Sequence, residues 1–81
     1  MGKDYMSELK NALKNTTLNI DLDKIDPDKD LTLQGVDSFD YLMLLYTVQD
    51  YFRVEIPDDA MISGSLNTLN KIFDLVRGES N

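Results

Sequence analysis

The chain has 81 residues and a formal net charge of −7, a length that suits one small domain over residues 1–81. It contains neither cysteine nor histidine, which excludes a disulfide framework, a thiolate nucleophile, a cysteine-ligated zinc site and any Ser–His or Cys–His catalytic pair. An acidic surface repels phosphate backbones, so no nucleic-acid binding is expected, and basic proteins are the natural partners.

No segment has the character of a membrane anchor. The longest unbroken apolar run, residues 42–45, is far too short to span a bilayer. The first residues, MGKDYMSE, lack the apolar core of a signal peptide. We therefore expect no stable membrane insertion and a cytoplasmic location.

The first predicted element is an amphipathic helix over residues 4–15, because Met6, Leu9 and Leu13 recur at i, i+3 and i+7. Residues 16–36 keep no helical period. Apolar and polar residues alternate over 18–22, which is a strand signal, but no partner strand is evident. We expect a long ordered loop that Ile25 and Leu31 pin to the core, and a loop of this length is uncommon unless it is functional.

The remaining elements are helical. Residues 38–52 carry the strongest helical pattern and are apolar over most of the circumference, which is typical of a buried helix or one that touches a partner. A short helical turn is expected over 58–63 and a last helix over 68–77, with Asn67 as its N-cap and 78–81 as a frayed tail. The fold class is therefore all-α: a small helical bundle of three main helices and one short helix, with a long first loop.

Three aspartates of the first loop, Asp26, Asp28 and Asp30, have the spacing of ligands 1, 3 and 5 in a calcium-binding loop. The sixth position, which needs a glycine for its sharp turn, is Leu31, and the twelfth is Asp37 instead of a bidentate glutamate. A solvated acidic loop with Asp-Pro turn chemistry is favoured, and no metal site is expected.

The stretch GVDSF, residues 35–39, precedes the long apolar helix and permits two interpretations. In the first, Asp37 caps the helix and Asp40 interacts favourably with the helix dipole in the first turn. In the second, the helix N-terminus also favours a phosphate group, which Ser38 could bear as a phosphodiester. Position alone does not choose between them.

The wider pattern resembles the acyl carrier proteins. GVDSFDYLMLLYTVQDYFRVEIPDD, residues 35–59, is similar to the G-x-D-S-L attachment motif, the second helix and the following E-I-P-D of that family. TLNKIFDLV (68–76) looks like its closing helix, and IDPDKDL (25–31) looks like its loop-one signature. The resemblance covers nearly the whole chain.

The resemblance implies an acyl-carrier-like bundle with 4'-phosphopantetheine esterified to Ser38 by a separate phosphopantetheinyl transferase. Asp37 would lie beside the phosphate and help the transferase and its magnesium to engage the serine. The thiol of the arm would hold acyl cargo as a thioester, which accounts for a carrier without cysteine. Such a protein is not an enzyme. It is expected to be a stand-alone monomer that presents cargo to acyl-loading and acyl-processing enzymes of fatty-acid, polyketide or related biosynthesis.

Departures from the family pattern suggest a specialised member. Phe39 replaces the usual leucine after the serine, and Met43 stands where the family's recognition helix usually has an acid, as does Gln49. Acids remain on this helix at Asp40 and Asp50. Partner binding is expected to involve a mixed set with apolar members: Phe39, Asp40, Tyr41, Met43, Tyr46 and Asp50.

Two alternatives stay open. The first is an aminoacyl or peptidyl carrier of the same fold, although the acid before Ser38 favours acyl cargo. The second, from a different class, is a helical protein-interaction module in which Ser38 is unmodified.

Overall fold

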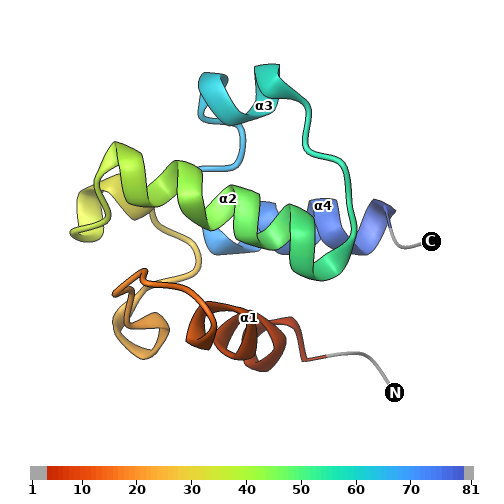
Figure 1. Cartoon of the computed structure of the whole chain (residues 1–81). Coiled ribbons are helices and arrows are strands. Elements are labelled where there is room, and N and C mark those ends of the chain that lie inside the picture. The colour runs from red at the N-terminus through yellow and green to blue at the C-terminus, as the bar shows by residue number, and fades with distance from the viewer. Residues whose placement is uncertain (1–3, 80–81) are drawn as a thin grey trace.

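The computed structural model describes residues 4–79, which form four α-helices and two short 3-10 helices (Figure 1). In chain order they are α1 (Tyr5–Lys14), η1 (Leu22–Lys24), η2 (Leu31–Gln34), α2 (Ser38–Phe52), α3 (Asp58–Ser63) and α4 (Leu69–Glu79). No strand occurs in this part of the chain. The predicted all-α bundle of three main helices, one short helix and a long first loop is confirmed.

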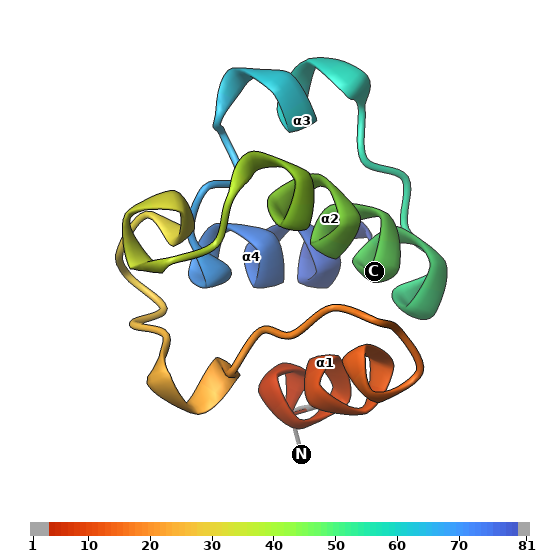
Figure 2. The same cartoon turned by 60° about the vertical axis from the view of Figure 1, so that its left-hand side comes forward.

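Helix α2 lies at the centre of the arrangement. Figures 1 and 2 show α4 beside it, α1 on one side of this pair and α3 on the opposite side of α2 from α1. The inward faces of the three long helices supply the fully buried aliphatic side chains Leu9, Leu44, Leu45, Val48, Leu69, Ile72 and Val76. Burial of this apolar surface is the main force that holds the helices together.

Three aromatic rings extend the contact among the long helices. Tyr5 of α1 stacks on Phe73 of α4, with ring centroids 6.0 Å apart, and meets Phe52 of α2 edge to face at 5.9 Å. Aromatic pairs favour these geometries. The start of α1 is thereby fixed against the end of α2 and the middle of α4.

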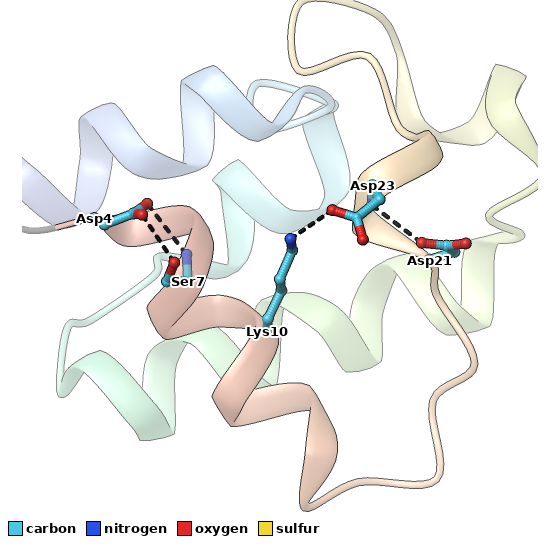
Figure 3. A network of polar contacts seen from close by, with 5 residues as sticks. All are labelled: Asp4, Ser7, Lys10, Asp21 and Asp23. Atoms are coloured by element: carbon cyan, nitrogen blue, oxygen red, sulfur yellow. Dashed lines mark hydrogen bonds and ion pairs between the residues drawn. The ribbon is translucent and has the colours of Figure 1, made fainter.

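Polar contacts secure α1 at its start and against the first loop (Figure 3). Asp4 is the N-cap of α1, and its carboxylate accepts hydrogen bonds from the Ser7 amide at 3.2 Å and the Ser7 hydroxyl at 2.8 Å. Lys10 forms an ion pair with Asp23 of η1 at 2.5 Å, and Asp23 in turn donates its amide to Asp21, the cap of η1. The loop is thus attached to α1 as it leaves that helix.

The first loop is ordered by both burial and hydrogen bonds. Ile25 and Leu31 are buried, as expected from the sequence. The Leu31 amide donates to the carbonyl of Asn67 at 2.8 Å, and the Asn70 amide donates to the carbonyl of Pro27 at 3.1 Å. The loop therefore lies against the start of α4.

The N-cap of α4 is Thr68, which corrects the prediction of Asn67. The Thr68 hydroxyl accepts the Lys71 amide at 3.2 Å, the contact that defines an N-cap. The Asn67 side chain instead donates to Asp30 at 3.1 Å and accepts from the Lys71 ammonium at 3.1 Å. Asn67 does not cap the helix because its side-chain amide is bonded to Asp30 of the first loop.

The last helix continues through Glu79, two residues beyond its expected end. Residues 80 and 81 of the predicted tail lie outside the described residues. Along 4–79, no helix is long and apolar enough to cross a membrane.

Candidate functional site

The start of α2 is built by Asp37. Its Oδ1 accepts the Asp40 amide at 2.8 Å, and its carbonyl accepts the Tyr41 amide at 2.9 Å. Gly35 ends η2 in the left-handed conformation, with φ of 91°, so the chain reverses just before the cap. The sequence interpretation of Asp37 as the helix cap is confirmed.

Ser38 is the first residue of α2, and it is exposed. Its hydroxyl forms no hydrogen bond with any other part of residues 4–79, because the capping role has passed to Asp37. The amides of Ser38 and Phe39 precede the first i−4 bond of the helix and have no hydrogen-bond partner within residues 4–79. An alcohol is therefore presented beside two free amides at the positive end of a helix dipole, which suits a phosphate group.

A cavity of about 550 Å³ opens beside Ser38. The residues that line it include Ser38, Tyr41 and Leu42 of α2 and Met61 and Ile62 of α3. Its lining is mixed, since polar side chains lie beside the apolar ones of Leu42, Met61 and Ile62; they belong to Asp30, Thr32, Ser38, Ser63 and Asn67. A group attached to Ser38 would have this cavity within reach.

Asp30 supplies the charged part of the cavity lining. Its carboxylate accepts the Thr32 hydroxyl at 2.6 Å, the Thr32 amide at 2.8 Å and the Asn67 amide group at 3.1 Å. These bonds, the Thr32 hydroxyl first, lower the pKa of Asp30 below its ordinary value. Asp30 is thus an ionised and fixed side chain at neutral pH.

Tyr41 is the cavity residue that departs most from expectation. It is only 7% exposed, because it shares the inward stripe of α2 with Leu44, Leu45 and Val48. The expectation that Tyr41 contributes to an exposed partner-binding surface is therefore wrong. Burial, and after it the negative charge of Asp30, raises the pKa of its phenol.

The other predicted partner-binding residues of α2 lie on its outward side. Phe39, Met43, Tyr46 and Asp50 follow the spacing i, i+4, i+7 and i+11, which places them on one stripe. Phe39 is 67% exposed and Tyr46 47%, whereas Met43 is half-buried. Asp50 is exposed, and Asp40 lies half-buried next to the stripe.

Two further exposed apolar side chains were missed by the sequence reasoning. Leu33 of η2 is 83% exposed and Ile62 of α3 is 82% exposed. Each belongs to a short helix whose buried residue, Leu31 or Met61, faces the core. No clear sequence signal existed for either side chain, since the 3-10 helix at Leu31–Gln34 was not predicted and adjacent residues of an α-helix can both be buried, as Leu44 and Leu45 are.

An all-α bundle with an exposed, unbonded serine at an acid-capped helix start has the arrangement of a carrier domain. Residues 8–76 match the family model described as "Phosphopantetheine attachment site". The chain belongs to this family. No curated protein and no solved structure matches it significantly.

Membership of this family defines the general role of the protein. It is a carrier with a site for covalent attachment of 4'-phosphopantetheine, and it is not an enzyme. It interacts with a phosphopantetheinyl transferase, which attaches the arm, and with biosynthetic enzymes that use the carrier.

Proposed function

We propose that Ser38 is the attachment residue and that the protein carries acyl intermediates as thioesters. The observation that carries this proposal is the exposed Ser38 hydroxyl, which has no hydrogen-bond partner within residues 4–79, at the N-terminus of α2. This position lies inside the range that matches the phosphopantetheine attachment family. No competing intramolecular bond has to be broken for the hydroxyl to react.

The neighbouring groups fit a phosphodiester at this point. The free amides of Ser38 and Phe39 and the helix dipole favour the negative charge of a phosphate. Asp37 holds the first turn through its bond to the Asp40 amide, and we assign it a second role beside the phosphate and the magnesium of the transferase. When bound, the arm supplies the thiol that the chain lacks.

We assign partner recognition to the outward stripe of α2, namely Phe39, Met43, Tyr46 and Asp50, with Asp40 beside it. Two large exposed rings lie in this stripe, and apolar and aromatic side chains dominate the energy of many interfaces. The acid that precedes Ser38 favours acyl over aminoacyl cargo. The enzymes served are those of fatty-acid, polyketide or related biosynthesis.

The attachment is tested by incubating the apo-protein with coenzyme A, magnesium and a broad-specificity phosphopantetheinyl transferase, followed by intact-mass measurement. We expect a gain of one phosphopantetheine group in the wild type and none in Ser38→Ala. Ser63→Ala, which changes another serine of the same cavity lining, is the matched control and should still gain the group.

Two results would contradict the assignment. One is a wild-type protein whose mass does not change with active transferase. The other is a mass gain that persists in Ser38→Ala. Transfer of acyl groups, but not of aminoacyl groups, from the cognate loading enzyme would support the choice of cargo.

A further inference from the structure

The hydroxyl of Tyr41 is a buried polar group without a partner. Its oxygen exposes less than 1 Å² and forms no hydrogen bond within residues 4–79. The rest of the residue is also buried, at 7% exposure, and lines the cavity beside Ser38. A buried hydroxyl normally has a partner, since removal from water without one is unfavourable.

The neighbouring polar groups do not supply that partner. Asp30 lines the same cavity, and its charge acts on the phenol of Tyr41. Its carboxylate accepts hydrogen bonds from Thr32 and Asn67 and none from Tyr41. Phenylalanine at position 41 would fill the same space without an unpaired oxygen. The presence of tyrosine therefore calls for a reason other than packing.

The position of Tyr41 indicates where a partner would come from. It lies three residues after Ser38 on α2, so the two side chains are on the same side of the helix about one turn apart. Both line one cavity. A group tethered to Ser38 can therefore enter the cavity from its edge and approach the phenol.

We propose that Tyr41 is the hydrogen-bond donor for a carbonyl or hydroxyl oxygen of the group tethered to Ser38. The oxygen belongs either to the pantetheine arm or to an oxygenated acyl cargo, such as a 3-oxoacyl chain. Tyr41 is then a specificity-determining residue inside the cavity and not a surface contact. This inference rests on the proposed attachment at Ser38.

The covering wall of the cavity can adjust to admit such a group. The phenol oxygen is covered, so a lining side chain must shift before a ligand oxygen reaches it. Met61 of α3 lines the cavity, and methionine is an adaptable side chain with three rotatable bonds. Helix α3, which carries Met61, has only six residues, and its N-cap, Pro57, makes no side-chain cap bond.

The first test compares thermal unfolding of the apo-protein with Tyr41→Phe and Tyr5→Phe. Tyr41→Phe removes an unpaired buried oxygen, so we expect its melting temperature to rise by roughly 5 °C. Tyr5→Phe keeps the ring contacts with Phe52 and Phe73 and should stay within about 1 °C of wild type. Arm-loaded, hexanoyl and 3-oxohexanoyl forms of each protein are then melted. The difference in melting temperature between Tyr41→Phe and wild type should become smaller in the loaded form whose arm or cargo bonds to the phenol.

The second readout follows Tyr41 directly, through the NMR signal of its ring carbon Cζ in protein labelled at tyrosine. A shift on loading with the bare arm assigns the oxygen to pantetheine. A shift that appears only with 3-oxohexanoyl, and not with hexanoyl, assigns it to the cargo. Both results support the proposal. A signal that does not move in any loaded form overturns it.

A third measurement separates this inference from the attachment at Ser38. Ser38→Ala, with and without Tyr41→Phe, is titrated with the free N-acetylcysteamine thioester of 3-oxohexanoate and with free pantetheine. We expect Tyr41→Phe to weaken the binding of whichever of the two probes bonds to the phenol, by roughly five- to tenfold. Binding that depends on Tyr41, without loading of Ser38 in the wild type, would refute the attachment alone. Loading of Ser38 without any response of Tyr41 in the loaded protein would refute the cavity inference alone.

Discussion

The side chain of Gln34 alone holds several backbone groups of the first loop together. Its Oε1 accepts the Asp26 amide at 2.7 Å, and its Nε2 donates to the carbonyls of Asp26 and Lys29, both at 3.1 Å. A more distant contact reaches the carbonyl of Asp30 at 3.4 Å. The glutamine supplies hydrogen bonds that a regular helix or sheet would have provided for the loop backbone.

We predict that Gln34→Leu destabilises the protein by about 1–2 kcal/mol, because it leaves backbone groups of the loop without partners. The measurement is the free energy of unfolding from urea titration. Gln34→Glu is the informative comparison, since it keeps the length and one acceptor but removes the amide donor. Its free energy of unfolding should fall by as much as that of Gln34→Leu or more, because its carboxylate would face carbonyl oxygens. Urea midpoints equal to wild type in both variants would show that the network contributes nothing.

The end of α2 contains a residue in an unfavourable backbone conformation. Arg53 is its C-cap, with φ of 57° and ψ of 46°, the left-handed region that side chains other than glycine rarely adopt. The conformation is retained because Gln49 holds the segment beyond it: its carbonyl accepts the Val54 amide at 3.2 Å and its Oε1 accepts the Ile56 amide at 3.0 Å. Val54 and Ile56 are thereby buried.

Arg53→Gly should therefore stabilise the protein, by about 0.5–1 kcal/mol, as relief of the left-handed conformation exceeds the extra entropy of glycine in the unfolded chain. Gly35→Ala provides the opposite case. Its φ is 91° and an added Cβ would meet nothing within 4 Å, so the expected loss of about 1 kcal/mol comes from the backbone alone. Urea unfolding measures both variants. A loss of stability in Arg53→Gly would mean that the arginine side chain contributes more than its backbone conformation costs.

Across the whole molecule, the sequence predicted what depends on local patterns. The bounds of α2, the short helix at 58–63 and the cap at Asp37 follow from apolar spacing and capping chemistry. The burial of individual aromatic side chains and the hydrogen-bond partners of individual polar ones could not be predicted in this way. Tyr41 and Tyr46 are both tyrosines of one apolar helix, yet the first is buried and the second exposed.

The reason for these failures is tertiary. The inward side of α2 is defined by where α1 and α4 pack, and a helix that is apolar nearly all round gives only a weak indication of that direction. Asn67 likewise lost the cap of α4 to Thr68 because Asp30, far away in the chain, binds its side chain. The proposed attachment residue needed no tertiary information, since the motif and the helix start that surround Ser38 are both local.

The charge of the molecule and the character of the proposed recognition stripe on α2 lead to a last prediction. The chain has a net charge of −7, but the outward stripe of α2 carries Phe39, Met43 and Tyr46 and only one acid, Asp50. Contacts of apolar side chains are much less sensitive to salt than ion pairs between exposed groups. The apparent KM of the transferase for the apo-protein should therefore rise only slightly, by roughly twofold or less, between about 50 mM and 300 mM salt.

Substitutions on the stripe separate the two kinds of contact. We expect Phe39→Ala to raise that KM by about five- to tenfold, since a large exposed ring at an interface centre is typical of a binding hot spot. Asp50→Asn, which keeps the shape and removes the charge, should change it by less than about twofold, as an exposed charge at an interface rim contributes little. Circular dichroism of each variant verifies that the fold is unchanged. A steep rise of KM with salt, together with a larger effect of Asp50→Asn than of Phe39→Ala, would instead assign recognition to the acids and leave the exposed Phe39 without a binding role.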